Sequence, residues 1–393
     1  MEEVYLVSAA RTAIGTFGGT LASIPAVQLG TLVIGEAVKR AAIQPEWVDE
    51  VIMGCVLQSA LGQGPARQAS VNAGIPQTVP AWTLNNICGS GLKSVAVAMA
   101  LIKAGECSCL VAGGMENMSR APFAANFVRE PHKMGNVDMV DTMLSDGLTD
   151  AFSGLHMGLT AEAVAEKYAL TRRELDEFAA ASQVKAGAAI ASGAFVEEIV
   201  PVSVPQRKGD PIIFKVDEHP RPNTTPEILA KLRPSFKPDG CVTAGNASGI
   251  NDGAAAFVVA GESFVKEHNL KPMARLVATA STALDPQYMG LGPIEATRKA
   301  LKKAGWSIGD LQLAELNEAF ASQSIAVMRD LEIDPAIVNV NGGAIALGHP
   351  IGASGARILT SLLYGMKHRG AKRGLATLCV GGGMGVAALV EAL

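Results

Sequence analysis

The chain has 393 residues, which exceeds the size at which a single hydrophobic core stops growing, so two or three domains are expected. Hydrophobic residues make up 49% of it and 42 residues are glycine, a composition typical of a globular protein with many tight turns. The 33 basic and 37 acidic residues nearly balance, and no basic block interleaves with aromatic residues. This pattern argues against nucleic acid as a partner.

The first apolar run, from Met1 onward, breaks at Arg11 without a basic n-region or a small-residue cleavage site. We therefore interpret it as a first strand and not as a signal peptide. No uninterrupted apolar stretch approaches the about 18 residues of a membrane span, so we expect no membrane partner. Without an export signal, free thiols and a cytoplasmic location are expected for the six cysteines, namely Cys55, Cys88, Cys107, Cys109, Cys241 and Cys379.

The N-terminal part alternates apolar strands with helical patterns. It begins with a near-continuously apolar strand, residues 4–9, followed by an amphipathic helix, residues 27–42, and a strand within residues 48–53. Cys88-Gly89-Ser90-Gly91 then opens a helix, and an apolar strand from Cys109 closes on Gly113-Gly114-Met115. Strands that alternate with helices indicate an α/β sheet with helices packed on its faces.

The middle of the chain, residues 120–249, has a different character. Residues 121–147 show no clear period, and helices are predicted at 160–167 and 171–187, the second with the capping box Thr171 and Glu174. A segment rich in proline and charge follows, and the apolar strand 253–259 returns to the first half. Because such a stretch is too long for a plain connection, we interpret it as an inserted loop domain over an active site or an oligomer contact.

The C-terminal part repeats the order of the N-terminal part. A strand at 274–279, a helix at 293–305 and a strand near 311–316 precede Gly352-Ala353-Ser354-Gly355, which opens a helix before a strand that ends on Gly381-Gly382-Gly383-Met384. The repeat predicts two pseudo-symmetric α/β halves. The resulting domains are residues 1–119 with 250–269, the loop domain 120–249, and the C-terminal half 270–393.

Cys88 lies where an apolar segment meets glycines and a helix begins. A lone buried cysteine is usually a small hydrophobe. The thiolate is the nucleophile, however, and a helix N-terminus directs positive partial charge and free N–H groups toward the sulfur, which would lower its pKa. We therefore predict that Cys88 is a nucleophile whose own N–H donates to the carbonyl oxygen of a thioester.

Three further residues are candidates for acid–base work. His349, between Gly348 and Pro350, could take the proton of Cys88. Cys379, at the end of an apolar strand before three glycines, is a second acid or base. Asn317 supplies an amide that could hold a water or a carbonyl oxygen, or could simply cap a helix. We expect no metal, because no Cys-x-x-Cys pair is present and a fourth ligand is not obvious.

Four blocks of this sequence together resemble the signatures of the thiolase family, and the resemblance extends from Val4 to Leu393. They are Asn86-Ile87-Cys88-Gly89-Ser90-Gly91, Asn317-Glu318-Ala319-Phe320, the glycine-rich block from Asn341 to Pro350, and Cys379-Val380-Gly381-Gly382-Gly383. The resemblance implies an α/β, five-layer αβαβα fold of two repeated halves with an inserted loop domain.

The family resemblance also implies a reaction. Cys88 would be acetylated by acetyl-CoA while His349 accepts its proton, and Cys379 would then remove the α-proton of a second acetyl-CoA to give acetoacetyl-CoA and CoA. His349 with a water on Asn317 would form one oxyanion hole, and the N–H groups of Cys88 and Gly381 the other. No permanently bound cofactor is implied, only coenzyme A thioesters as substrates.

Contacts to coenzyme A and a short acyl pocket carry over by the same resemblance. The residues are Ser248, His156, Met157, Leu148, Arg221, Phe236, Ala244, Met289, Ala319 and Phe320. The family also implies a homotetramer with tetramer contacts in residues 120–147. Three alternatives stay open: a degradative enzyme for longer 3-ketoacyl-CoA, a non-catalytic acyl-CoA binding protein, and a thiol switch formed by Cys88 and Cys379.

Overall fold

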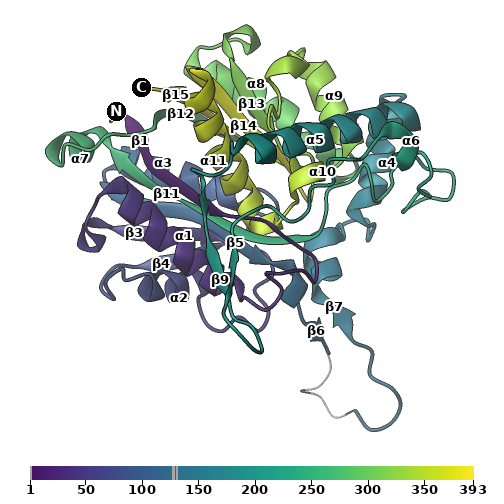
Figure 1. Ribbon diagram of the computed structural model, residues 1–393, viewed down its shortest axis with the longest axis horizontal. Coiled ribbons are helices and arrows are strands. Elements are labelled where there is room, and N and C mark those ends of the chain that lie inside the picture. Colours follow the sequence, from purple (N-terminus) through teal and green to yellow (C-terminus); the bar gives the residue numbers. More distant parts are fainter. Residues whose placement is uncertain (1, 126–128, 130–131) are drawn as a thin grey trace.

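The computed structural model describes residues 2–125, 129 and 132–393, and its two halves follow one plan (Figure 1). The N-terminal half contains β1 (Val4–Thr12), β2 (Gly15–Thr16), α1 (Ala26–Ala41), β3 (Glu50–Gly54), α2 (Pro65–Asn72), β4 (Ala81–Leu84), α3 (Ser90–Ala104), β5 (Cys109–Asn117), β11 (Asn251–Gly261) and α7 (Glu262–Glu267). The C-terminal half contains β12 (Ala274–Ala283), α8 (Gly292–Ala304), β13 (Leu313–Leu316), α9 (Ala321–Leu331), α10 (Ala344–Leu347), α11 (Ile351–Arg369), β14 (Arg373–Val380) and β15 (Met384–Ala392).

The strands of both halves form one continuous sheet in the order β13-β14-β15-β12-β1-β11-β5-β3-β4. The halves join where β1 pairs antiparallel with β12, at Tyr5 opposite Arg275 and Leu6 opposite Ala274. Outward from this joint, each half continues with two antiparallel pairings and then a parallel one. The strand order and strand directions therefore confirm the predicted internal repeat.

A bulge marks the same place in each half. The register of β1 against β11 shifts between Leu6 and Ser8, and that of β12 against β15 shifts between Leu276 and Ala278. Bulges re-aim a strand and are structural features of a fold, not defects. Their equivalent positions are a second sign of duplication, and the hydrophobic pattern alone did not reveal it.

The helices complete five layers, as the family resemblance implied. α1 packs on one outer face with α2, and α8 packs on the opposite outer face with α9, while α3 and α11 lie between the two halves of the sheet (Figure 1). The stretch Ile87–Ala104, which includes α3, is long and apolar enough for a membrane span, with a mean hydropathy of 1.5. Its position in the middle layer, packed on β5 and α11, is that of a core helix.

The two middle helices approach each other through glycines. A Cβ atom on Gly91 would lie 2.7 Å from the backbone nitrogen of Ala356, and one on Gly355 would lie 2.4 Å from that of Leu92. Only glycine permits such a contact, because backbone atoms cannot move aside as side chains do. The first turns of α3 and α11 therefore meet, which brings Cys88 beside His349.

The prediction for the end of β5 was wrong. The strand does not close on Gly113-Gly114-Met115 but continues to Asn117. A Cβ on Gly114 would lie 2.2 Å from the carbonyl oxygen of Gly352, so this glycine admits the start of α11 and makes no turn. In the other half, β14 does end at Val380 as predicted, and Gly382 and Gly383 turn with φ of 79° and 78°.

In its described part, the middle of the chain forms three helices and several short strands. They are β6 (Phe123–Ala124), β7 (Val140–Asp141), α4 (Met157–Lys167), α5 (Arg172–Ser192), β8 (Ile199–Val200), β9 (Val202–Val204), β10 (Ile212–Phe214) and α6 (Pro226–Leu229). The capping box of Thr171 and Glu174 is confirmed at the start of α5. α4 and α5 share a core with Phe320 and Ile345, while β8 pairs with β1, so this insertion contacts both halves. The three-part domain division stays a prediction.

Candidate active site

Cys88 lies on a strained turn directly before α3. The preceding residue, Ile87, has a φ of 45°, which is rare for a β-branched side chain. Ser90, the first residue of α3, holds this turn: its Oγ accepts a hydrogen bond from the Asn86 N–H at 2.8 Å and donates to the Ile87 carbonyl at 2.6 Å. The sulfur is thereby held at the helix start, as the glycine-flanked motif predicted.

The structure corrects the expected pKa of Cys88. Burial raises the pKa of this thiol to about 11, and hydrogen bonds from the N–H groups of Gly381 and Cys88 itself offset only part of that rise. Loss of hydration disfavours the charged form of the thiol, and here it outweighs the helix N-terminus. Cys88 therefore rests as a thiol, and it would have to lose its proton to act as the predicted nucleophile.

His349 lies immediately before α11, and its backbone N–H donates to Asn251 Oδ1 at 2.9 Å. Its ring contacts two polar side chains: Nδ1 lies 2.5 Å from Ser354 Oγ, and Nε2 lies 3.4 Å from Asn317 Nδ2. Burial, together with the nearby Arg357 cation, lowers the pKa of His349 to about 3. The imidazole is therefore neutral at physiological pH and can accept a proton.

Cys379 and Gly381 lie at the junction of β14 and β15. Cys379, next to the last residue of strand β14, is 1% exposed, and burial and the neighbouring Cys88 raise the pKa of its thiol far above the ordinary value. The N–H of Gly381 donates to the Cys88 sulfur. The two cysteines, almost 300 positions apart in sequence, thus lie on one cavity, although one precedes a helix and the other ends a strand.

A cavity of about 500 Å³ connects these groups to the surface. Cys88, His349 and Cys379 line it, and so do all ten residues predicted for coenzyme A and acyl contacts: Leu148, His156, Met157, Arg221, Phe236, Ala244, Ser248, Met289, Ala319 and Phe320. Asn317 and Gly381 do not line it but lie directly behind His349 and Cys88. A larger cavity, of about 770 Å³, lies near the far end of α11 and holds none of the predicted residues.

The predicted acyl pocket has an aromatic wall. The His156 ring stacks on Phe236 with centroids 4.8 Å apart, and Phe236 meets Phe320 edge to face at 6.4 Å. His156 also caps α4, because its Nδ1 accepts from the Gly158 N–H at 3.0 Å. A Cβ on Gly158 would collide with the Phe236 ring, which explains the glycine there. These contacts leave the wall little freedom to widen.

Sequence reasoning missed several polar residues at this site. His219 lines the cavity near Arg221, and Glu116 accepts hydrogen bonds from the N–H groups of Val56 and Gly352 beneath it. Ser354 and Arg357 touch His349 and Asn317 from α11. The available signal was an arginine and a serine inside an otherwise small and apolar helix pattern, where charge is costly to bury.

Comparison with known proteins gives the class of this chain. Residues 4–263 match the family model of the thiolase N-terminal domain, and residues 270–392 match that of the thiolase C-terminal domain. The chain belongs to the thiolase family.

Among individual relatives, the acetyl-CoA acetyltransferase of Thiocystis violacea is 57% identical over 392 residues and that of Cupriavidus necator is 55% identical over 391, with 100% of each chain covered. The crystal structure of the Bacillus anthracis acetyl-CoA acetyltransferase superimposes with a TM-score of 0.98 at 45% identity, and covers 100% of this chain and 99% of that one.

Proposed function

We propose that this protein is an acetyl-CoA C-acetyltransferase that condenses two acetyl-CoA reversibly to acetoacetyl-CoA and CoA through an acetyl-Cys88 intermediate. The observation that carries the proposal is the meeting of Cys88, His349 and Cys379 on one cavity. The full-length similarity to acetyl-CoA acetyltransferases supports the same reaction. The family membership and this nucleophile favour an acyltransferase over a non-catalytic acyl-CoA binding protein.

In the first half of the reaction, the Cys88 sulfur attacks the thioester carbonyl while His349 Nε2 takes the thiol proton. The N–H groups of Cys88 and Gly381 stabilise the oxyanion. The bond to coenzyme A then breaks, and Cys379 gives its proton to the leaving thiolate. Cys379 is left ionised, and the imidazolium of His349 compensates its charge in the same cavity. Forming a covalent intermediate in this way splits one difficult step into two.

In the second half, the Cys379 thiolate removes the α-proton of a second acetyl-CoA. A thiolate whose pKa is raised by burial is a strong base, which suits a weakly acidic carbon. The enolate oxygen accepts from the Nε2–H of His349, and its carbon attacks acetyl-Cys88 to form acetoacetyl-CoA. The released Cys88 thiolate recovers its proton from His349, so both thiols and the neutral imidazole are restored.

Chain-length profiling separates this proposal from a degradative enzyme for longer acyl chains. The rigid wall of His156, Phe236 and Phe320 predicts that thiolysis of acetoacetyl-CoA is at least about tenfold more efficient than that of a 3-ketoacyl-CoA of eight carbons. The ratio of kcat/KM for the two substrates measures this preference. Equal or better efficiency on the longer substrate would support the degradative function instead.

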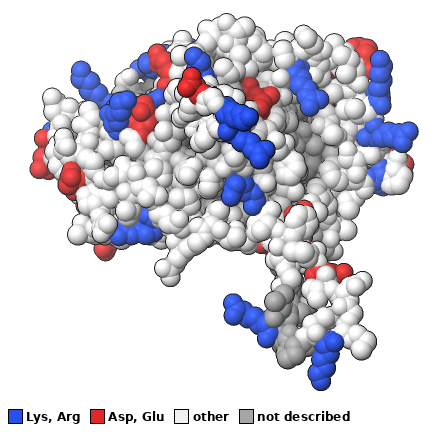
Figure 2. Space-filling view, turned by 60° about the horizontal axis from the view of Figure 1, so that its bottom comes forward, with Lys and Arg blue, Asp and Glu red and all other residues white. Residues whose placement is uncertain are grey.

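We further propose a homotetramer in the cytoplasm that uses coenzyme A thioesters and carries no resident cofactor. The protruding segment around β6 and β7 exposes apolar side chains, which supports the tetramer. Elsewhere the visible surface carries basic and acidic side chains interspersed (Figure 2). The thiol switch between Cys88 and Cys379 stays a prediction, and cycling between a mild oxidant and dithiothreitol tests it.

A further inference from the structure

Two buried side chains on α11, Ser354 and Arg357, contact the His349–Asn317 pair from the side away from the cavity. Ser354 is fully buried and Arg357 is 1% exposed. Neither is among the residues that line the substrate cavity. Because they lie three residues apart, they share one face of the helix. Their contacts determine where the protons of the pair lie.

Arg357 determines the orientation of the Asn317 amide. A guanidinium has only donors, and Arg357 Nη2 lies 3.5 Å from Asn317 Oδ1. The reverse orientation would place the amide N–H₂ group against the cation. The amide nitrogen of Asn317 must therefore face His349 Nε2, at 3.4 Å. Because Nε2 faces a donor, it carries a lone pair and no proton.

Ser354 leads to the same tautomer from the other side of the ring. Its Oγ lies 2.9 Å from the carbonyl oxygen of Pro350 and 2.5 Å from His349 Nδ1. A carbonyl oxygen only accepts, so the single hydroxyl proton of Ser354 is used on Pro350. The Ser354 oxygen then accepts a hydrogen bond from His349 Nδ1–H. The chain of hydrogen bonds thus begins at Arg357, which only donates, and ends at the Pro350 carbonyl, which only accepts. These two ends leave one consistent arrangement of protons between them.

We propose that Ser354 and Arg357 are positioning residues that direct the hydrogen bonds from Arg357 through Asn317, His349 and Ser354 to Pro350. Neutral His349 then keeps its proton on Nδ1, and its Nε2 carries the lone pair that Cys88 needs, which the Asn317 amide contacts only at the long distance of 3.4 Å. The consequence of this tautomer for catalysis rests on the proposed function, because in that reaction Nε2 takes the proton of Cys88. The proton on Nδ1 stays on that nitrogen, hydrogen-bonded to Ser354 Oγ, through both half-reactions, while Nε2 alone gains and loses one.

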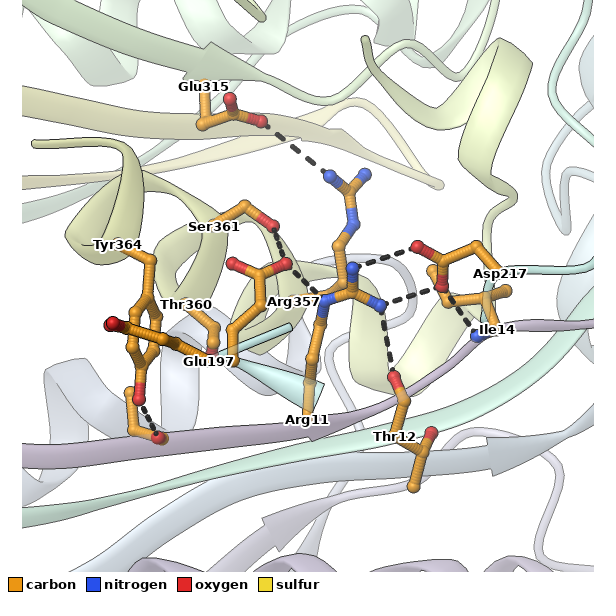
Figure 3. A network of polar contacts seen from close by, with 12 residues as sticks. Arg11, Thr12, Ile14, Glu197, Asp217, Glu315, Arg357, Thr360, Ser361 and Tyr364 are labelled. Atoms are coloured by element: carbon orange, nitrogen blue, oxygen red, sulfur yellow. Dashed lines mark hydrogen bonds and ion pairs between the residues drawn. The ribbon is translucent and has the colours of Figure 1, made fainter. Parts of the chain in front are cut away.

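The charge of Arg357 is weakly compensated, which strengthens its effect on this pair. Arg357 Nη1 lies 3.6 Å from Glu315 Oε2, and among the described residues neither its Nε nor its Nη1 has a hydrogen-bond partner (Figure 3). Arg11, close by, is in contrast saturated by Asp217 at 2.7 and 2.9 Å and by Glu198 at 2.5 Å. The largely uncompensated charge of Arg357 therefore acts on the Asn317 carbonyl oxygen and strengthens the orientation of that amide.

Neutron diffraction of the resting, perdeuterated protein tests the tautomer without any assay of activity. We expect deuterium on His349 Nδ1 and none on Nε2, with the Ser354 deuteron directed at the Pro350 carbonyl. Deuterium on Nε2, or a Ser354 deuteron directed at Nδ1, would overturn the proposal. The result holds whether or not the protein condenses acetyl-CoA, so it can fail separately from the proposed function.

The rate of CoA release in the first half-reaction tests whether this arrangement of protons helps His349 to accept the proton of Cys88. Two variants are compared: Ser354→Ala, and Arg357→Met combined with Glu315→Gln, where the second substitution leaves no carboxylate unpaired. Each should slow acetyl-Cys88 formation at least about tenfold at saturating acetyl-CoA. Arg357→Lys, which keeps a donor and the charge, should recover part of the loss. Rates within twofold of wild type in both folded variants would contradict the proposal, and if the double variant does not fold, Ser354→Ala alone decides.

Thr360→Val is the matched control. Thr360 Oγ1 donates to the Ala356 carbonyl four residues back at 3.0 Å, as Ser354 does to Pro350, and it is equally buried in α11. It contacts neither His349 nor Asn317 in the described structure. We expect this variant to release CoA at the wild-type rate. If it is slowed as much as Ser354→Ala, the effect of the serine substitution comes from a less stable helix and not from the contact with His349.

Discussion

At the scale of single residues, burial governs the chemistry of this site. It raises the pKa of both thiols and lowers that of His349. All three groups therefore rest in their neutral forms, although the proposed reaction requires each to ionise or gain a proton. These three side chains thus carry no charge before the substrate arrives. In that reaction the N–H groups of Cys88 and Gly381 are fixed donors for the oxyanion.

Glu116 provides a pH-dependent test at this scale. Burial raises its pKa from 4.5 to about 7 despite its backbone hydrogen bonds. Between these pH values the unfolded chain has released the proton and the folded chain retains it, so stability is lost as pH rises through this window. The shift corresponds to about 3 kcal/mol of unfolding free energy. Urea unfolding of wild type and Glu116→Gln, from pH 5 to pH 8 at one protein concentration, measures it.

Glu116→Gln also disturbs hydrogen bonds at every pH, so the slopes with pH are to be compared and not the absolute stabilities. The wild-type free energy should fall more steeply than that of the variant, and the two curves should converge toward pH 8. Parallel curves would mean that Glu116 does not titrate in this range. Asp252, whose pKa is also raised, to about 6, contributes equally to both proteins.

The sequence indicated which residues would come together, because they stand in glycine-rich blocks of unusual composition; their catalytic roles stay predictions. Cys88, His349 and Cys379 do meet on one cavity, together with the ten predicted lining residues. Arg357 and Glu116 were missed because their importance arises from burial and from partners distant in sequence. The expected low pKa of Cys88 was wrong for the same reason, since dehydration cannot be read from a local motif.

At the scale of elements, the crossing of α3 and α11 positions the site. Gly355→Ala would place a Cβ 2.4 Å from the Leu92 backbone nitrogen, and neither backbone can yield without moving a helix. We expect a loss of about 1 to 3 kcal/mol in unfolding free energy, together with slower acetyl-Cys88 formation as Cys88 and His349 separate. Thermal unfolding and the rate of CoA release measure the two effects.

Gly35→Ala in α1 is the control for that substitution. Its Cβ would meet only the Ala73 carbonyl, at 3.8 Å, which is an ordinary contact. Because alanine is favoured over glycine within a helix, this variant should gain about 0.5 to 1 kcal/mol and keep its rate. An equally stable and active Gly355→Ala variant would show that the close helix crossing does not position the site.

At the scale of the whole molecule, the protruding arm around β6 and β7 is the predicted tetramer contact. The arm protrudes from the rest of the molecule (Figure 1). Its Met134 and Met139 side chains are 91% and 61% exposed, which is unusual for apolar side chains that remain in contact with solvent. Met134→Asp with Met139→Asp should reduce the mass found by light scattering from four chains to two. Val196→Asp, at a 74% exposed apolar residue elsewhere, should leave the mass unchanged.

A tetramer that survives the two arm substitutions would contradict this assignment.

The overall architecture was predictable because the same order of strands and helices occurs twice along the chain. The joint of the two halves between β1 and β12 and the paired bulges were not, because pairing register depends on contacts between strands that lie far apart in the sequence.

The central claim is that Cys88 carries the acetyl group, and mass spectrometry of peptides after brief mixing with acetyl-CoA tests it most directly. Wild type and Cys379→Ala should carry one acetyl group on the peptide that contains Cys88, and Cys88→Ala should carry none. Only wild type should go on to release acetoacetyl-CoA. An acetyl group that persists in Cys88→Ala, or one found on Cys379 in wild type, would contradict the account.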